Sequence, residues 1–170
     1  MLDRRRLLGR GVAVIAFAAS TRRIAVAAAE KFEVTLPESE WRKRLTPAQY
    51  AVLRESDTER PGTSPLLKEK RPGNFVCAGC DLPLFSSSTK FESHTGWPSF
   101  WMPLDKAVGI ERDVSVGMVR TAVHCRRCGG HLGHVFDDGP PPTGLRYCIN
   151  GVVLDFEKAK EAEKKYNEKQ

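Results

Sequence analysis

The sequence predicts a mainly β fold in which short antiparallel strands follow a helical N-terminal part. Three observations point to this fold class. The chain has 170 residues, which is enough for one domain with its own hydrophobic core. From Asn74 onward, short apolar segments alternate with turn residues, a pattern typical of strands. Earlier in the chain, Thr46 and Pro47 signal a helix start, because threonine caps helices and proline suits their first position.

Residues 1–29 are predicted to be an export signal rather than part of the fold. The segment Arg4–Leu8 reads Arg-Arg-Arg-Leu-Leu, and its Arg-Arg-x-Leu-Leu pattern resembles a twin-arginine signal. The apolar run 11–19 is too short for a membrane span, and the small residues over 25–29 offer cleavage sites. We therefore expect a periplasmic protein without stable membrane association. An ordinary secretion signal and an uncleaved anchor are the alternatives.

The net charge gives no indication of a nucleic-acid partner. The whole chain carries a formal charge of +6, but residues 1–29 hold six arginines and one aspartate. The remainder is therefore close to charge balance, with a net charge of about +1. It has no basic stripe interleaved with aromatic residues, so we expect no nucleic-acid partner.

After the leader, the chain is expected to contain one folded domain, 46–156, with a segment on either side. Residues 30–45 are polar with scattered apolar side chains and should form an extended arm. Within the domain, a helix over 46–56 should precede a proline-rich loop. The charged segment 157–170 has a weak apolar stripe, so we expect a solvated helical tail. Strands are expected over 74–76, 83–85, 108–110, 114–119, 121–124, 144–150 and 152–156.

Two Cys-x-x-Cys pairs, Cys77/Cys80 and Cys125/Cys128, predict a metal site. They supply four thiolates in the tetrahedral arrangement typical of structural zinc. Their wide separation is acceptable in a β domain, because two hairpins can bring the pairs together. An iron–sulfur cluster, two disulfides and a redox-active pair are the alternatives. We expect one structural Zn²⁺ per chain, whose binding contributes to folding.

Cys148 is the fifth cysteine and lies in the expected strand 144–150. Side chains alternate along a strand, so Arg146, Cys148 and Asn150 share one face, and apolar side chains occupy the other. A fixed positive charge beside a thiol lowers its pKa and favours the reactive thiolate. A lone cysteine is more often a small buried apolar residue, but these polar neighbours favour a reactive one.

Two histidines follow the second cysteine pair. His131 and His134 would face opposite sides of an ideal strand, but Gly130 and Gly133 permit a bend that turns both toward one pocket. Either histidine alone would be better explained as a surface or hydrogen-bonded structural residue. Together with an acidic pair and an arginine-flanked thiol, they indicate a reactive site.

Three blocks of this sequence form a recognisable set. Two of them are Cys77-Ala-Gly-Cys80 with Pro-Leu-Phe after it, and Thr95-Gly-Trp-Pro-Ser-Phe. The third is Cys-x-x-Cys-Gly-x-His-Leu-Gly-His-Val-Phe-x-Asp-Gly-Pro, followed by Gly-Leu-Arg-Tyr-Cys-Ile-Asn, within 125–150. Together they resemble the signature of the B-type methionine sulfoxide reductases, which reduce methionine-R-sulfoxide. The resemblance covers 46–156. It implies a zinc-bearing β-tent of two antiparallel sheets with N-terminal helices, and reductase activity in protein repair.

The resemblance also implies catalytic roles. Cys148 resembles the catalytic cysteine, whose thiolate attacks the sulfoxide sulfur and becomes a sulfenic acid. His131 and His134 occupy the places of residues that bind and protonate the sulfoxide oxygen. Asp138 resembles the residue that orients this histidine network.

Other matching residues would shape the pocket. Arg146 would favour the Cys148 thiolate, and Asn150 would help to hold the site. Trp97 resembles an aromatic wall that packs the substrate's S-methyl group, consistent with the affinity of sulfur for aromatic rings. Phe136 is a second expected substrate contact. For Trp97 alone, plain core packing would be the simpler explanation.

One departure from the family pattern bears on the reductant. Many members carry a second, resolving cysteine before Gly-Trp-Pro-Ser-Phe, and this chain has Thr95 there. With four cysteines assigned to zinc, no thiol remains to form a disulfide with Cys148. We therefore expect a sulfenic acid that is reduced from outside, by a small thiol or a thioredoxin-like protein. We also expect a monomer.

Two other functions are compatible with parts of the pattern. A zinc-bearing β module that binds a peptide or small ligand would explain the cysteine pairs but not the polar face around Cys148. A hydrolase using Cys148 with His134 would need an oxyanion hole and no reductant. Reduction of R-configured but not S-configured methionine sulfoxide would separate the reductase from both.

Overall fold

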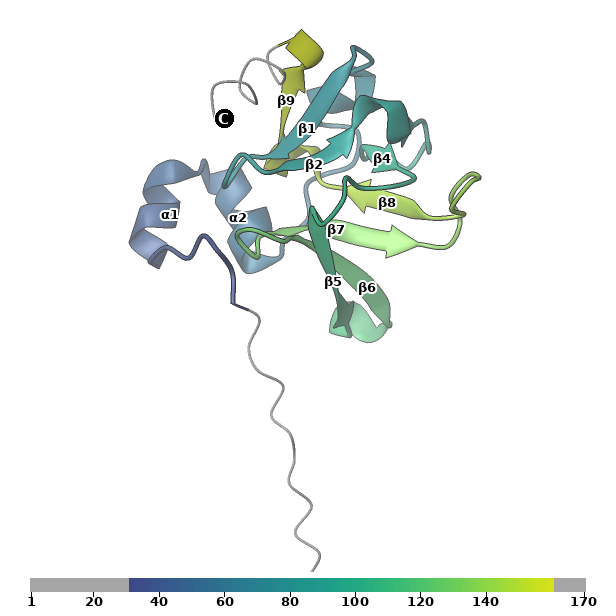
Figure 1. Ribbon diagram of the computed structural model, residues 1–170. Helices are drawn as coiled ribbons and strands as arrows, with labels where there is room; N and C mark the ends of the chain where they lie inside the picture. The colour runs from purple at the N-terminus through teal and green to yellow at the C-terminus, as the bar shows by residue number, and fades with distance from the viewer. Residues whose placement is uncertain (1–30, 161–170) are drawn as a thin grey trace, which may run out of the picture. The chain divides into compact units, whose positions relative to one another are not determined.

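Residues 31–160, which the computed structural model describes, form two antiparallel β-sheets and two N-terminal helices (Figure 1). The mainly β architecture expected from the sequence is confirmed. The helices lie side by side at one end of the sheets (Figure 1). Within the described range, no helix is both long and apolar enough to cross a bilayer.

Helix α2 (Pro47–Glu55) begins where the sequence predicts. The Thr46 hydroxyl accepts a hydrogen bond from the Gln49 backbone N–H, and the Gln49 side chain accepts one from the Thr46 backbone N–H. This reciprocal capping box satisfies two N–H groups that a helix start leaves unpaired. The helix buries Tyr50, Val52 and Leu53, and it packs against β7.

Helix α1 (Glu38–Arg44) lies where the sequence suggested an extended arm, and for these residues that prediction is wrong. Acidic residues occupy its first turn and basic residues its last turn, which complements the helix dipole. Trp41 supplies the anchor, because only 3% of its surface is exposed. The Arg54 guanidinium of α2 lies 5.0 Å from the centre of the Trp41 ring.

The smaller sheet has the order β2-β1-β9. Its strands are β1 (Gly73–Cys77), β2 (Pro83–Ser86) and β9 (Leu154–Lys158). The larger sheet has the order β3-β4-β8-β7-β6-β5. Its strands are β3 (Lys90–Phe91), β4 (Ser99–Phe100), β5 (Val108–Asp113), β6 (Arg120–Cys125), β7 (His131–Phe136) and β8 (Arg146–Ile149). Short 3-10 turns connect them at η1 (Pro65–Lys68), η2 (Ser87–Thr89), η3 (Ser115–Gly117) and η4 (Gly151–Val153).

Three phenylalanines join the two sheets. Phe85 of β2 stacks on Phe100 of β4 with ring centres 4.4 Å apart, and Phe75 of β1 meets the same ring edge-on at 5.0 Å. All three side chains are fully buried. Aromatic packing of this kind contributes through both buried area and ring geometry. The larger sheet, which carries the Cys148 strand, is thereby held against the smaller one.

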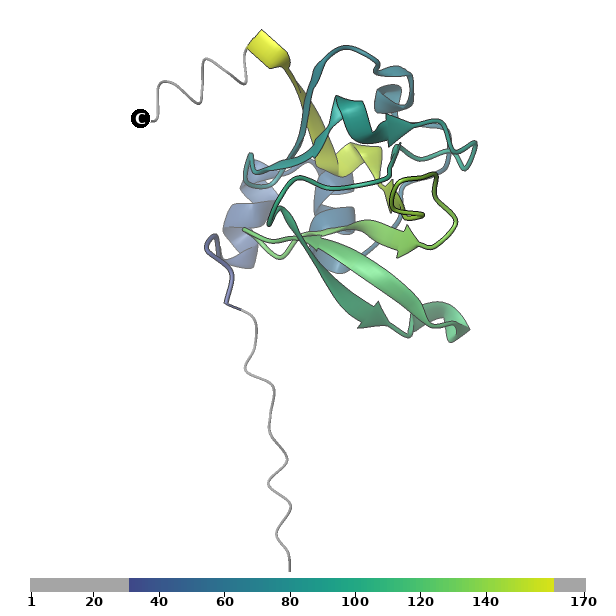
Figure 2. The same cartoon turned by 45° about the vertical axis from the view of Figure 1, so that its right-hand side comes forward.

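The strand predicted over 114–119 is wrong, because these residues turn the chain between β5 and β6. Ser115–Gly117 form a 3-10 turn, and Gly117 has a φ of 75°, which favours glycine. The apolar side chains of Val114, Met118 and Val119 are exposed there. The β5–β6 hairpin projects from the rest of the larger sheet, as the turned view shows (Figure 2).

The charged tail also differs from expectation at its start. Residues 157 and 158 belong to strand β9 and not to the predicted helix. Residues 161–170 and the predicted signal 1–29 lie outside the described residues.

Candidate zinc centre and active site

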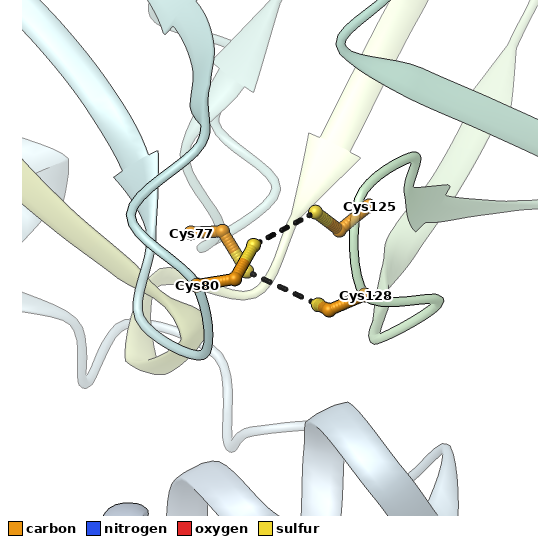
Figure 3. Close-up of side chains that lie close together, drawn as sticks. All are labelled: Cys77, Cys80, Cys125 and Cys128. Atoms are coloured by element: carbon orange, nitrogen blue, oxygen red, sulfur yellow. Dashed lines mark hydrogen bonds between the residues drawn. The ribbon is translucent and has the colours of Figure 1, made fainter. Parts of the chain in front are cut away.

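The four paired cysteines converge at one point (Figure 3). Cys77 and Cys125 are the last residues of β1 and β6, and Cys80 and Cys128 follow in the adjoining loops. The sulfur atoms lie within 4.8 Å of one another, with 3.8 Å between Cys77 and Cys128 and 3.5 Å between Cys80 and Cys125.

These distances fit zinc and not disulfides. A disulfide requires about 2.05 Å between its sulfurs, and all four cysteines are free. A tetrahedral Zn²⁺ with bonds of about 2.3 Å separates its thiolate sulfurs by about 3.8 Å. The four cysteines therefore form a structural zinc site, and none of these four thiols is left to act in catalysis. The zinc prediction and its four ligands agree with this geometry.

Long basic side chains hold the two cysteine loops together. Arg54 of α2 donates a hydrogen bond to the Cys128 carbonyl at 3.0 Å. Arg127, in the second loop, donates one to the Cys80 carbonyl of the first loop at 3.1 Å. The zinc site thus ties helix α2 and both sheets to one another, and β7 starts directly beyond it.

Cys148 lies in a small pocket on the larger sheet, separate from the cysteine cluster. In the register of β7 and β8, Cys148 is directly opposite His134 and Arg146 is opposite Phe136. Side chains of opposed residues share a face of the sheet. The pocket has a volume of about 120 Å³ and is lined by Thr58, Trp97, Arg120, Gly133, His134, Phe136, Cys148 and Asn150.

Burial dominates the ionisation of Cys148. It raises the pKa of the thiol above its ordinary value, while the Thr95 hydroxyl and the Arg146 guanidinium act in the opposite direction. The predicted influence of Arg146 on the thiolate is present, but it does not outweigh desolvation. At neutral pH the resting thiol is therefore protonated and carries a proton into the reaction.

Thr95 belongs to a chain of hydroxyl groups beside Cys148. Its Oγ1 lies 3.8 Å from the Cys148 sulfur and 2.9 Å from the Ser93 hydroxyl, which in turn lies 2.7 Å from the Ser99 hydroxyl. Ser99 is buried and pairs with Cys148 across β4 and β8. Polar groups thus pack one side of the thiol at the place where the family pattern has a resolving cysteine.

The bend predicted between the two histidines is present, but of the two only His134 is among the residues that line the Cys148 pocket. The pairing of β6 with β7 is irregular at His124, and the rings of His131 and His134 lie 5.3 Å apart, edge to face. Glycine is required at 133, because a Cβ there would meet the Cys148 carbonyl oxygen at 2.1 Å. Burial and the neighbouring His134 lower the pKa of His131 to about 4, so the His131 ring is neutral at physiological pH.

Asp138 contacts Arg146. Its two carboxylate oxygens accept hydrogen bonds from Nε and one Nη of Arg146, each at 2.8 Å. The same guanidinium lies 4.4 Å from the centre of the Phe136 ring. Asp138 thus fixes Arg146, the arginine that flanks Cys148. It does not orient the histidines as expected, because the carboxylate beside His134 belongs to another residue.

That residue is Asp113, which sequence reasoning missed. Its Oδ2 atom lies 2.8 Å from Nε2 of His134 and 2.7 Å from an Nη atom of Arg120. Arg120 itself lines the Cys148 pocket. The wrong prediction of a strand over 114–119 concealed the roles of Asp113 and Arg120. Only a turn at Ser115–Gly117 brings the end of β5 beside the start of β6.

Glu59 is a further residue that sequence reasoning missed. Its backbone N–H donates to the Asn150 side chain at 3.0 Å, and its backbone carbonyl accepts from Trp97 Nε1 at 3.1 Å. Its carboxylate accepts from the backbone N–H groups of Gly151 and Val152. Glu59 therefore connects two walls of the pocket. A lone glutamate in a proline-rich loop gave no signal for this role.

The sequence profile of the SelR domain matches residues 45–158. A peptide methionine sulfoxide reductase MsrB of Pseudomonas putida (strain W619) is 58% identical over 128 residues, which cover 75% of this chain and 95% of that protein. The MsrB of Leptospira interrogans is 53% identical over 128 residues, covering 75% and 98% of the two chains. That of Agrobacterium fabrum is 55% identical over 126 residues, covering 74% and 93%. This chain therefore belongs to the SelR-domain family of peptide methionine sulfoxide reductases of the MsrB type.

Proposed function

We propose that this chain reduces methionine-R-sulfoxide in proteins and that Cys148 is its nucleophile. The activity is that of the family, whose domain spans residues 45–158. The observation that carries the assignment of Cys148 is its position in the pocket, directly opposite His134 and outside the zinc cluster. Trp97 and Phe136 line the same pocket and would enclose the S-methyl group.

The reaction transfers one oxygen atom from the substrate to Cys148. The sulfur of Cys148 attacks the sulfoxide sulfur while the sulfoxide oxygen accepts a proton. The protonated oxygen then breaks its bond to the methionine sulfur and bonds to the Cys148 sulfur, as the transient sulfur–sulfur bond breaks. The thiol and the sulfoxide become a cysteine sulfenic acid and a methionine thioether, so two electrons pass to the methionine sulfur. Two external thiols then reduce the sulfenic acid, giving the Cys148 thiol, a disulfide and water.

The two histidines have different parts in this proposal. His134 faces Cys148 and its Nε2 atom lies against a carboxylate, which fixes the ring with its other nitrogen free for the substrate and suits a proton donor. His131 is buried and its pKa is lowered to about 4, so it acts as a neutral hydrogen-bonding partner. Asn150, held by Glu59 and by the Leu132 carbonyl, would keep the pocket in shape.

Peptides bearing R- or S-configured methionine sulfoxide test the activity, with dithiothreitol as reductant. We expect turnover of the R form alone and none with Cys148→Ser. The variant should keep its zinc and its circular dichroism spectrum, because Cys148 is outside the cluster. Turnover of both forms, or activity of a correctly folded Cys148→Ser variant, would refute the proposal. Hydrolysis of a thioester or ester substrate without reductant would favour the hydrolase alternative.

We propose further that the protein is a monomer exported by the twin-arginine route to the periplasm. The Arg-Arg-x-Leu-Leu pattern within Arg4–Leu8 supports the route. A protein that loads zinc on thiolates gains from folding in the reducing cytoplasm before export. Mass spectrometry of the N-terminus from a periplasmic fraction, compared with an Arg4→Lys/Arg5→Lys variant, tests cleavage and route. Light scattering on the purified protein tests the monomer.

A further inference from the structure

We propose that Asp113 is a positioning residue for His134, fixing which ring nitrogen holds a proton and leaving Nδ1 for the sulfoxide oxygen. This inference rests on the proposed function and adds a residue from the β5–β6 hairpin to the site. It assigns a role in catalysis to a hairpin that is otherwise only the edge of the larger sheet.

The geometry of the hairpin brings the carboxylate to the histidine. Asp113 ends β5 and Arg120 begins β6, and the two are paired in register. The Asp113 Oδ2 atom accepts a hydrogen bond from Arg120 at 2.7 Å and lies 2.8 Å from His134 Nε2. The other oxygen, Oδ1, accepts the backbone N–H of Ser115 at 2.8 Å. Both carboxylate oxygens are therefore engaged, so the carboxylate has little freedom to turn.

Asp113 is an anion at neutral pH. Hydrogen bonds from Ser115 and His134 hold the pKa of its carboxyl well below the usual range, and Arg120 contributes in the same direction. Its side chain is only 16% exposed and that of His134 only 12%. An ionised carboxylate can only accept hydrogen bonds, so Nε2 of His134 must be the protonated ring nitrogen.

The consequence for His134 follows from the two nitrogens of its ring. With Nε2–H donated to Asp113, Nδ1 is the nitrogen left for the substrate. The carboxylate also stabilises the imidazolium, in which Nδ1 carries the proton to be donated. The other charged or titratable groups around the ring are Arg120, His131 and Cys148. Among these four neighbours, Asp113 is the one that supplies a negative charge to the resting site.

A purely structural role for Asp113 would predict a different result. The carboxylate also caps the turn at Ser115 and pairs with Arg120, so its loss will lower stability in either case. Both roles need the Nε2–H tautomer of His134, but only the positioning role requires a loss of turnover that exceeds the loss of folded protein.

The first test uses the wild-type protein and needs no catalysis. Long-range ¹H–¹⁵N correlation spectra of the zinc-loaded, ¹⁵N-labelled chain report which nitrogen of His134 holds the proton, at a pH where the ring is neutral. His134→Gln identifies its signals. We expect the Nε2–H tautomer. A neutral His134 with its proton on Nδ1 would overturn the inference, whatever the behaviour of the variants.

The second test compares Asp113→Asn, Asp113→Glu and the control Asp137→Asn, which removes an exposed carboxylate that directly follows β7. An amide at 113 removes the negative charge that faces Nε2, and with it the stabilisation of the positively charged ring that donates from Nδ1. A general acid contributes about 100-fold or more to rate, so Asp113→Asn should lower kcat about 10- to 100-fold, with KM changed less than about threefold. Asp113→Glu keeps the charge and should recover part of the loss.

An unchanged kcat in folded Asp113→Asn, or an equal loss in Asp137→Asn, would overturn the inference. The assay also separates this inference from the proposed function. If the wild type itself fails to reduce R-sulfoxide, the proposed function fails, and the tautomer measurement still decides whether Asp113 controls His134.

Discussion

The Thr95 hydroxyl lies 3.8 Å from the sulfur of Cys148. A resolving thiol at position 95 would therefore reach the oxidised cysteine with a shift of under about 2 Å, since a disulfide joins its sulfurs at about 2.05 Å. The hydroxyl chain through Ser93 and Ser99 holds Thr95 at this place. The site thus has the arrangement of a two-cysteine enzyme with an inert group in the second position.

Replacing Thr95 with cysteine should convert the enzyme to an intramolecular mechanism. After one equivalent of methionine-R-sulfoxide without reductant, mass spectrometry should find a disulfide between residues 95 and 148 in Thr95→Cys. The wild type should instead hold a sulfenic acid that dimedone labels. Thr95→Ser, which keeps the hydroxyl, is the matched control and should behave as the wild type. A disulfide between Cys148 and a zinc-ligand cysteine in the wild type would contradict the expected external reductant.

The buried thiol of Cys148 should react with iodoacetamide only at elevated pH. Desolvation raises its pKa and Arg146 lowers it in part, so the thiolate fraction grows as pH rises through a value above that of an ordinary cysteine. Arg146→Gln should move the alkylation profile further to alkaline pH. Arg112→Gln, which removes an exposed arginine from β5, should leave the profile in place. A wild-type profile centred below that of a free cysteine would show that Arg146 outweighs burial.

The parts of the site that sequence reasoning found are local in sequence. Alternation along a single strand was enough to place Cys148 and Asn150 in one pocket and Arg146 beside the thiol. Two glycines were enough to predict the bend between His131 and His134. The four cysteines were found for a different reason: the chemistry of a tetrahedral thiolate site requires them to meet, however far apart they are in the chain.

The parts that were missed depend on contacts between distant segments. Asp113 reaches His134 only because 114–119 form a turn, and the apolar residues there imitated a strand. Glu59 acts through its backbone as much as through its side chain, and no residue pattern reports backbone hydrogen bonds between a loop and a strand. The assignment of Asp138 to the histidines was drawn from the resemblance, and only coordinates could show that it pairs with Arg146.

Removing zinc should unfold the domain at room temperature. Structural zinc sites contribute about 10–16 kcal/mol of apparent binding free energy, which is as large as the whole stability of a typical domain, about 5–15 kcal/mol. Cys128→Ser and chelation with EDTA should both abolish the cooperative thermal transition seen by circular dichroism. Cys148→Ser, which leaves the cluster intact, should retain one zinc and the wild-type transition. A chelated protein that melts with an unchanged midpoint would show that the cluster is not structural.

Replacing Glu59 with glutamine should loosen the pocket without touching a reacting group. The two carboxylate oxygens accept hydrogen bonds from the Gly151 and Val152 backbone N–H groups. A glutamine amide has only one oxygen, so its NH₂ group would face one of these N–H groups and leave it without an acceptor. Leaving a half-buried N–H unsatisfied costs about 1–3 kcal/mol, so urea denaturation should show a loss of about this size.

The kinetic effect of Glu59→Gln should fall mainly on KM. The backbone of Glu59 holds Trp97 and Asn150, so an unanchored loop weakens the walls that enclose the substrate, whereas Cys148 and His134 keep their places on β8 and β7. Glu111→Gln, an exposed substitution on β5, is the matched control and should change neither stability nor KM. If Glu59→Gln lowers kcat with KM unchanged, the loop acts on the reacting groups rather than on the substrate walls.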